Sequence, residues 1–312
     1  MPTPATGATV PSAQIAKTGD FSAFLKPEQA QDYFAEVEKT SIVQKVARKV
    51  PMGPTGITIP FWNGAVNAQW IGETERKPLT KGSFDHKELE PTKIAVIFAE
   101  SAEVVRANPL NYLQTMRTKI AEAIALAFDN AALHGINKPT KFKGYLAETT
   151  KTQSLGTNAY DALAVSGLKK LTDAGKKWTG TLLDATTESI LNGSVDASGR
   201  PLFNEPVYAG QASPIREGSI VGRQTIVNDH VKNNTVLGFQ GDFTQVIWGQ
   251  VGGLSFDVTD QATLDFGQAN ASTGVWEPNL ISLWQHNMVA VRCEAEYAFL
   301  VNDTDAFVKL TA

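Results

Sequence analysis

The sequence of 312 residues lacks the features that mark secreted, membrane-spanning and nucleic-acid-binding proteins. It has a single cysteine, Cys293, which excludes an intrachain disulfide and suits a reducing compartment. No apolar run approaches the roughly 20 residues needed to span a bilayer. Residues 1–14 show neither the basic region nor the apolar region of a signal peptide. The net charge of −4 implies no strong bulk attraction to nucleic acid.

Motifs for common enzymatic chemistry are also missing. The sequence has no Walker loop, dinucleotide-binding glycine fingerprint, metalloprotease helix motif or nucleophile elbow. The histidines are far apart, without ligand spacing; they are His86, His134, His230 and His286. His134 falls in the last turn of a predicted helix, where the helix dipole favours a cation. We therefore expect no catalytic site, no metal and no cofactor.

Three small groups of charged residues are the remaining candidates for chemistry. Glu294 and Glu296 share one face of a predicted strand, where exposure to solvent or contact with a neighbour's Lys or Arg is favoured over acid–base chemistry. Asp303 and Asp305 flank a predicted turn, for which a turn role is favoured over calcium binding. A basic loop is expected to be solvated rather than phosphate-binding. Its members are Lys138, Lys141 and Lys143. Cys293, in a predicted strand, is expected to be a buried structural thiol.

The sequence does contain a long amphipathic helix directly preceded by extended chain. Asn108-Pro109 opens the helix and Gly135 ends it, which predicts a helix over 109–134 of about seven turns, roughly 40 Å long. Its apolar residues recur every three or four positions and predict one buried face. They are Leu110, Leu113, Met116, Ile120, Ile124, Ala127, Phe128 and Ala131. A compact enzyme rarely needs this pair of elements, whereas a subunit that reaches over its neighbours does.

The extended chain before the helix predicts a projecting arm. Residues 57–62 and 93–99 are rich in β-branched and aromatic residues and predict strands. Between them, residues 62–92 predict a two-stranded arm with a charged, glycine-containing tip at 72–82. An isolated hairpin is marginal in water, so we expect the arm to be stable only when it lies on another surface.

The rest of the chain predicts helices and strands with few β–α–β units. This favours an α+β fold over a doubly wound nucleotide-binding fold. A short helix is predicted from Pro27 to about Lys39, and a second amphipathic helix over 161–177. Residues 245–251 and 254–258 predict a hairpin whose turn is Gly252-Gly253.

Six short segments indicate a family resemblance through their residues and their order along the chain. They are Ala68-Gln69-Trp70-Ile71-Gly72-Glu73, the helix run from Ile120 to Asp129-Asn130-Ala131-Ala132-Leu133-His134-Gly135, Lys143-Gly144-Tyr145-Leu146, Gly199-Arg200-Pro201-Leu202-Phe203, Leu237-Gly238-Phe239-Gln240-Gly241-Asp242-Phe243 and Asp305-Ala306-Phe307-Val308-Lys309-Leu310. In this order they resemble the major capsid protein family of tailed bacteriophages, the Hong Kong ninety-seven-type shell fold. Each motif alone is weak, but six in order form a specific signal.

The resemblance implies a division of the chain. It gives an N-terminal arm at 1–26, an extended loop at 62–92, a peripheral domain at 27–61, 93–145 and 280–312 with 109–134 as its spine helix, and an axial domain at 146–279. Copies would tile into pentamers and hexamers that close an icosahedral shell around double-stranded DNA, with no cofactor and no membrane. The expected location is the virion, assembled in the host bacterial cytoplasm.

The resemblance also implies partners and contact residues. Expected partners are further copies of the chain and the portal, scaffolding or decoration proteins of the same virus. Many members carry an N-terminal scaffolding segment, which this chain lacks, so a separate scaffold or none is expected. Intersubunit contacts are expected at Trp70, Glu73, Glu75, Arg76, Lys77 and Lys81.

Some members of this family join a loop lysine to a neighbour's asparagine with help from a glutamate. The residues of this sequence that could do so are Lys77, Lys81, Asn279, Asn287, Asn302 and Glu294. Ordinary intersubunit ion pairs, worth at most about 1 kcal/mol each, remain the favoured interpretation.

Two alternatives stay open. An encapsulin-type compartment would keep the fold but hold a cargo enzyme instead of DNA. An enzyme with an unrecognised site would remain a monomer or small oligomer and would never form particles.

Overall fold

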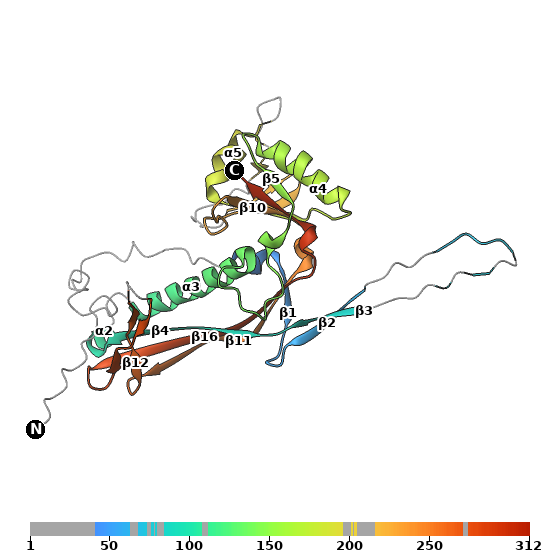
Figure 1. The fold of residues 1–312 in the computed structure, drawn as a ribbon. Coiled ribbons are helices and arrows are strands. Elements are labelled where there is room, and N and C mark those ends of the chain that lie inside the picture. Colours follow the sequence, from blue (N-terminus) through green and yellow to red (C-terminus); the bar gives the residue numbers. More distant parts are fainter. Residues whose placement is uncertain are drawn as a thin grey trace, which may run out of the picture. The chain divides into compact units, whose positions relative to one another are not determined.

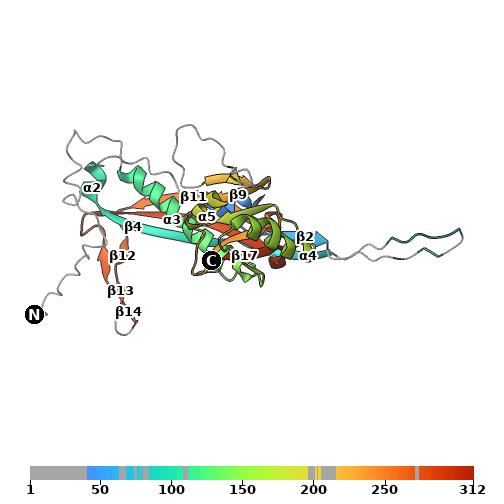
Figure 2. The same ribbon diagram turned by 90° about the horizontal axis from the view of Figure 1, so that it is seen from above.

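The structure is a computed structural model that describes most of the chain. The described residues are 41–62, 68–73, 76–77, 79, 84–107, 112–195, 201, 203–204, 216–270 and 274–312. Helices and strands are mixed along the chain (Figures 1 and 2), which confirms the predicted α+β class. The predicted arm at 1–26, the helix from Pro27 and the turn beginning at Gly199 lie wholly or mainly outside these residues.

The helices and strands have the following bounds. The α-helices are α1 (Ile42–Val46), α2 (Ala102–Ala107), α3 (Tyr112–His134), α4 (Leu168–Asp173) and α5 (Glu188–Gly193); the π-helix is η6 (Asp161–Gly167), and the 3-10 helices are η5 (Leu146–Glu148), η7 (Ala185–Thr187), η8 (Phe243–Gln245) and η9 (Thr304–Ala306). The strands are β1 (Arg48–Pro51), β2 (Ile57–Trp62), β3 (Phe84–Leu89), β4 (Thr92–Ser101), β5 (Thr152–Ser154), β6 (Gly180–Leu183), β7 (Phe203–Asn204), β8 (Arg216–Ile220), β9 (Arg223–Val227), β10 (Val236–Gly241), β11 (Val246–Thr259), β12 (Thr263–Asp265), β13 (Gln268–Ala269), β14 (Trp276–Glu277), β15 (Leu280–Ser282), β16 (Met288–Val301) and β17 (Phe307–Thr311).

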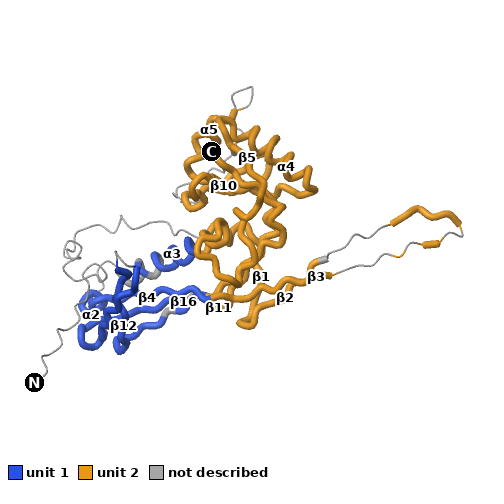
Figure 3. The backbone as a smooth tube through the Cα atoms, viewed as in Figure 1, with its two compact units in different colours: residues 1–40, 93–127, 253–295 blue, residues 41–92, 128–252, 296–312 orange. Residues whose placement is uncertain are grey.

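Contacts between Cα atoms divide the chain into two compact units (Figure 3). Unit 1 includes residues 93–127 and 253–295, and unit 2 consists of residues 41–92, 128–252 and 296–312. Helix α3 and strands β11 and β16 each begin in one unit and end in the other. Among the described residues, no helix combines the length and the apolar character needed to cross a membrane.

A four-stranded sheet has the order β1-β11-β16-β4, with β1 parallel to β11. Its strand β11 overturns the predicted hairpin at Gly252-Gly253, because the strand runs without a turn from Val246 to Thr259. Gly252 has a φ of +65°, the left-handed conformation that glycine also adopts in turns. The glycine pair therefore marks an irregular position inside a strand rather than its end.

A seven-stranded sheet in unit 2 has the order β5-β17-β10-β6-β9-β8-β7. One face packs against η6, α4 and α5 and forms an apolar cluster (Figure 1). That cluster includes Leu163, Leu171, Leu183, Leu191, Val227, Val308 and Leu310. The Phe239 ring of this sheet lies 5.6 Å from the ring of His134, at the end of α3. The last strand, β17, lies between β5 and β10.

The long helix is present as α3, and its end is where the sequence predicts it. Gly135 follows with a φ of +71°, and its N–H donates to the Ala131 carbonyl at 3.1 Å. Ile120, Ile124 and Phe128 are buried, which confirms the apolar face. Ala127, which we placed on that face, is exposed. The predicted start at 108–111 lies outside the described residues.

Phe128 anchors α3 in an aromatic cluster of unit 2. Its ring centroid lies 5.1 Å from Tyr297 and 5.9 Å from both Phe142 and Phe299, and the Trp248 ring lies 6.4 Å away. Such tilted and edge-to-face pairs add about 0.5–1.5 kcal/mol each beyond simple burial. The helix is therefore fixed by tertiary packing as well as by its own hydrogen bonds.

The second predicted helix, over 161–177, is shorter and partly of another type. Residues Asp161–Gly167 form a π-helix, and α4 ends at Asp173. The Gln240 side chain explains the π-helix, because its Nε2 donates to the Leu163 carbonyl at 2.8 Å. A Cβ added at Gly167 would lie only 2.1 Å from Gln240 Oε1. Val165, which we placed on the apolar face, is 59% exposed, because a position two residues from the buried Leu163 lies on the opposite side of a helix.

Gly167→Ala is therefore expected to destabilise unit 2 by about 1–3 kcal/mol through steric overlap with Gln240. Gly193→Ala is the matched control, since nothing lies within 4 Å of a Cβ built at that helical position. Denaturant unfolding of the purified subunit measures both. Equal midpoints for the two variants would contradict the packing described here.

Candidate intersubunit surface

The segment between β2 and β3, together with the first residue of β3, carries the most exposed apolar side chains of the described residues. Trp70 is 104% exposed, Leu79 93% and Phe84 72%. Glu73, Arg76 and Lys77 in the same segment are also exposed, while Glu75 and Lys81 lie outside the described residues. Exposed apolar side chains gathered on one segment make that segment a candidate interaction surface.

The base of this loop is firmly attached to unit 2. Strands β2 and β3 pair antiparallel from Ile57↔Leu89 to Trp62↔Phe84. Their inner side chains join an apolar cluster with the ends of β11 and β16. It consists of Leu89, Ile247, Ala298 and Leu300, with Val50, Met52, Ile59 and Phe61 packed against it. Strands β2 and β3 are thus packed into unit 2 where the loop begins and ends.

A second exposed surface lies in unit 1, on the segment that runs from β12 to the turn after β15. Trp276 is 55% exposed, Leu280 63% and Trp284 71%. One carboxylate organises this surface, because Asp265 accepts hydrogen bonds from three donors. These are Trp276 Nε1 at 2.9 Å, Asn279 N at 2.7 Å and Gly267 N at 2.8 Å. The indole hydrogen bond, followed by the two backbone bonds, lowers the pKa of Asp265. Asp265 therefore holds an exposed tryptophan in one orientation.

Removing this carboxylate should loosen the hairpin without unfolding unit 1. In Asp265→Ala we expect amide hydrogen exchange at Gly267 and Asn279 to accelerate about tenfold or more, because both N–H groups lose their acceptor. Asp260→Ala, a change at an exposed position in the same region, is the control. Unchanged exchange in Asp265→Ala would show that the carboxylate does not organise the hairpin.

Glu294, the glutamate considered for crosslinking, is already paired within unit 1. Its carboxylate lies 3.0 Å from Lys93 Nζ and 3.4 Å from Arg292 Nε, and its side chain is 22% exposed. Asn287 precedes β16 and has a φ of +50°. The two residues are seven positions apart along extended chain, or about 23 Å at about 3.3 Å per residue. Glu294 therefore cannot assist Asn287 of its own copy.

We next consider the polar residues outside the two exposed surfaces, for which the sequence predicts no catalytic or metal site. The described part of the chain contains no cluster of His, Cys, Asp or Glu suited to a metal ion. Our prediction of a favoured cation at His134 is wrong. Burial lowers the pKa of His134, and its Nε2 bonds to the Val231 carbonyl at 2.9 Å. Desolvation at this site thus outweighs the hydrogen bond to Val231, which acts in the opposite direction.

The other predicted polar groups have structural roles. Cys293 is fully buried, and burial raises the pKa of its thiol, which confirms a structural cysteine. Asp303 Oδ1 accepts from Asp305 N at 2.9 Å, as expected in a turn. In the basic loop, Lys138 donates to the Phe142 carbonyl and Lys141 pairs with a glutamate of unit 2, Glu90 at 3.3 Å.

Sequence reasoning missed a buried carboxylate that joins α1 to α3. Asp129 Oδ1 accepts from Ser41 Oγ at 2.5 Å and Val43 N at 3.2 Å, and Oδ2 accepts from Ile42 N at 2.9 Å. Asp129 is 2% exposed, and burial raises its pKa from 3.8 to about 6 against the opposing effect of these hydrogen bonds. Ser41 before an apolar run indicated a capped helix start. No pattern in the sequence indicated that Asp129, 88 residues later, would accept its hydrogen bond.

Comparison with known proteins gives concordant matches over nearly the whole chain. The model of the "Phage capsid family" matches residues 22–312. The "Probable major capsid protein gp17" of Mycobacterium phage L5 is 60% identical over 310 residues, covering 96% of this chain and 93% of that protein. The protein of the same name from Mycobacterium phage D29 is 59% identical, with coverages of 98% and 96%.

Solved structures show the same fold at lower identity. The chain from Mycobacterium phage Adephagia aligns with a TM-score of 0.71 at 19% identity, covering 95% of this chain and 97% of that one. The chain from Gordonia phage Cozz aligns with a TM-score of 0.65 at 19% identity, covering 99% and 96%.

Proposed function

The chain belongs to the phage capsid family, and from this membership we propose that it is the major capsid protein of a tailed bacteriophage. Copies assemble into the pentamers and hexamers of an icosahedral shell that encloses double-stranded DNA. The observation that carries this proposal is 60% identity to a probable major capsid protein over 96% of the chain. The chain acts as a structural subunit and not as an enzyme.

The exposed loop supplies the physical reason for assembly. Burying a large apolar side chain such as Trp70 or Leu79 against a neighbouring copy contributes about 1.5–3 kcal/mol. A free subunit leaves this stabilisation unused, and a ring of subunits gains it at every contact. Glu73, Arg76 and Lys77 then select the correct partner surface by charge. The residues of the predicted contact set thus act together as one docking segment.

We propose the same domain division that the sequence suggests, with an N-terminal arm, an extended loop, and peripheral and axial domains. The net charge of −4 suits a shell that confines DNA without binding particular sequences. Portal, scaffolding or decoration proteins of the same virus are the further partners. Assembly takes place in the host bacterial cytoplasm, and the finished location is the virion.

Electron microscopy of particles from cells that express the chain tests this function. Closed icosahedral shells or isolated rings of five and six subunits support it. In a phage infection the same shells should contain nuclease-protected DNA. Particles that contain an enzyme and no DNA would favour a cargo compartment. A chain that forms no assembly of any kind would contradict both the phage shell and the cargo compartment.

Ion pairs and covalent crosslinks are two ways in which Lys77 and Lys81 could join neighbouring copies. Since Glu294 lies about 23 Å along the chain from Asn287, a crosslink at Asn287 would need the glutamate from a different copy. Boiling purified particles in detergent separates the two cases. One band at the 33.6 kDa of the chain supports ion pairs, and a ladder of covalent multimers supports crosslinks.

A further inference from the structure

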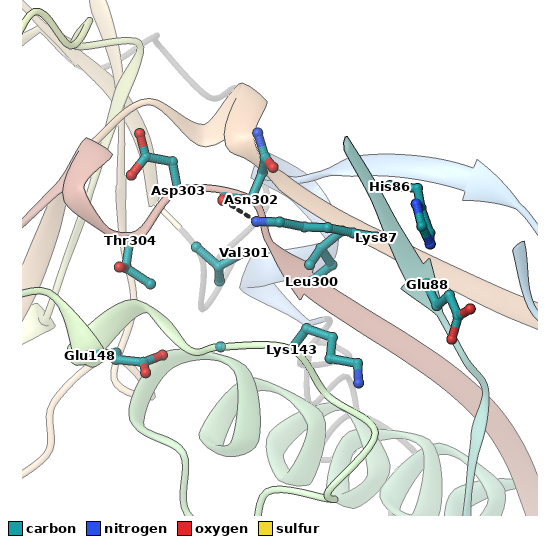
Figure 4. Close-up of a pocket in the computed structure, with 11 residues that line it drawn as sticks. His86, Lys87, Glu88, Lys143, Glu148, Leu300, Val301, Asn302, Asp303 and Thr304 are labelled. Atoms are coloured by element: carbon teal, nitrogen blue, oxygen red, sulfur yellow. Dashed lines mark hydrogen bonds between the residues drawn. The ribbon is translucent and has the colours of Figure 1, made fainter. Parts of the chain in front are cut away.

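A cavity of about 740 Å³ in unit 2 opens beside β3 and the end of β16 (Figure 4). The charged side chains of its lining balance in sign. They are Lys87, Lys143, Glu88 and Glu148, together with Asp303, which pairs with Lys176. The cavity therefore favours no ligand of one charge. A different feature of unit 2, a strained turn at one edge of the seven-stranded sheet, indicates a partner.

Strands β8 and β9 are joined by a turn of two residues, Val221 and Gly222, after the last strand pair Ile220↔Arg223. Their φ angles are +53° and +70°. A type I′ turn requires positive φ at both positions and prefers asparagine or glycine. The other non-glycine residues with positive φ in the described part of the chain are all asparagines. Valine is β-branched and crowds the backbone in this conformation, so Val221 is strained.

Packing within the chain does not explain a valine at this turn. Val221 is 47% exposed, and a Cβ built at Gly222 meets nothing within 4 Å. The turn is nevertheless fixed, because Arg223 Nη1 donates to the Val221 carbonyl at 3.5 Å and Nε donates to the Trp178 carbonyl at 3.0 Å. The guanidinium also lies 4.5 Å from the centroid of the Trp178 ring. An exposed apolar side chain is thus held in one position at a cost in folding stability.

Two further exposed apolar residues lie at the same edge of the sheet. The edge strand β7 pairs with β8 through Phe203↔Ile220, so Val221 lies at the level where β7 begins. Pro201, two residues before Phe203, forms an isolated bridge with Val195. Both Pro201 and Val195 are exposed. We call Val195, Pro201 and Val221 the β7 corner.

We propose that the β7 corner is an interface with a second copy of this chain, in which Val221 packs against apolar side chains of the neighbour. The inference rests on the proposed function, because every subunit of a shell meets further copies of itself. Valine is unfavourable for the turn and becomes favourable only where a contact buries its side chain. The three residues of the corner are uncharged, which argues against nucleic acid as the occupant, since phosphates are bound by cations.

Val221→Asn separates the strain from the contact, because it should raise subunit stability and weaken assembly. Below the assembly concentration, the denaturant midpoint of unfolding should rise, since asparagine suits a positive φ. The subunit concentration at half-assembly, measured by light scattering, should rise about tenfold through loss of the apolar contact. Val221→Gly should change both quantities in the same directions. Val221→Thr keeps the β-branch, and should weaken assembly without stabilising the subunit.

Val165→Asn is the matched control, because Val165 is an exposed valine of the same unit without a positive φ. It should neither stabilise the subunit nor change the concentration at half-assembly. Assembly of Val221→Asn at the wild-type concentration would overturn the interface, and an unfolding midpoint that does not rise would overturn the strain from which it is inferred. Either result leaves the proposed function standing, because the wild-type chain still assembles. A wild-type chain that stays monomeric would overturn the proposed function, and the interface with it.

Discussion

Deletion of residues 72–82 should leave a soluble, folded subunit whose particle yield falls at least about tenfold. The deleted segment includes Leu79, which is 93% exposed, and the charged residues Glu73, Arg76 and Lys77. The apolar cluster at the loop base, with Ile59, Phe61 and Leu89, remains intact. Assembly loses a docking segment at every contact, so small losses multiply around a ring. Particle yield after gradient sedimentation, together with the circular dichroism of the subunit, measures both parts of the prediction.

A double substitution tests the role of the loop in assembly with less disturbance of the backbone than the deletion. Trp70→Ala with Leu79→Ala removes two nearly fully exposed side chains and should reduce particle yield in the same direction. Val165→Ala is the matched control, because Val165 is 59% exposed on η6, away from the loop in the sequence. Normal particle yield from the loop deletion would show that the loop does not drive assembly.

Asp129→Ala should cause the largest loss of subunit stability, about 2–4 kcal/mol in the free energy of unfolding. It leaves three donors without their acceptor, namely Ser41 Oγ and the N–H groups of Ile42 and Val43. Denaturant unfolding measures the loss. Asp173→Ala, at an exposed position in the same unit, should stay within about 0.5 kcal/mol of wild type. A wild-type midpoint for Asp129→Ala would show that the carboxylate does not join α1 to α3.

The same carboxylate gives a pH dependence with a defined sign. The folded-state pKa of Asp129, about 6, lies above its usual value of 3.8, so the folded chain binds the proton first. The resulting stabilisation is complete below pH 3.8 and is lost as the pH rises through about 6. The free energy of unfolding therefore decreases by about 3 kcal/mol between the acidic and the neutral limit through this one group.

Asp129→Asn removes this titration and isolates it from all other groups. The difference in unfolding free energy, wild type minus Asp129→Asn, should fall as the pH rises from 4 to 7. A difference that is constant over this range would contradict a raised pKa at Asp129. A difference that rises would reverse the sign and would mean that the ionised form stabilises the fold.

Elements built from local patterns could be predicted from the sequence. The end of α3 at Gly135, the strands β2 to β4 and the buried Ile120, Ile124 and Phe128 follow from periodicity and from glycine's conformational freedom. The π-helix could not be predicted, because Gln240, 77 residues beyond Leu163, imposes it. The sequence did not predict the continuous strand β11, because a glycine pair is compatible both with a turn and with an irregular position inside a strand.

The candidate surface was predictable in position but not in detail. Charged and aromatic residues around a glycine-containing tip indicated an exposed loop, and Trp70, Arg76 and Lys77 are indeed exposed. The role of Asp265 could not be foreseen, because its donors at Trp276 and Asn279 meet only when the hairpins fold. In the proposed shell the surface that the loop contacts belongs to a second copy of the chain, and no local sequence pattern specifies where that copy lies.

Light scattering coupled to size-exclusion chromatography tests the central claim most directly, that this chain is a self-assembling shell subunit. The purified chain should elute with five or six times the 33.6 kDa mass of one copy, or as larger shells. A mass of 33.6 kDa at every concentration, with no rings or particles, would contradict it.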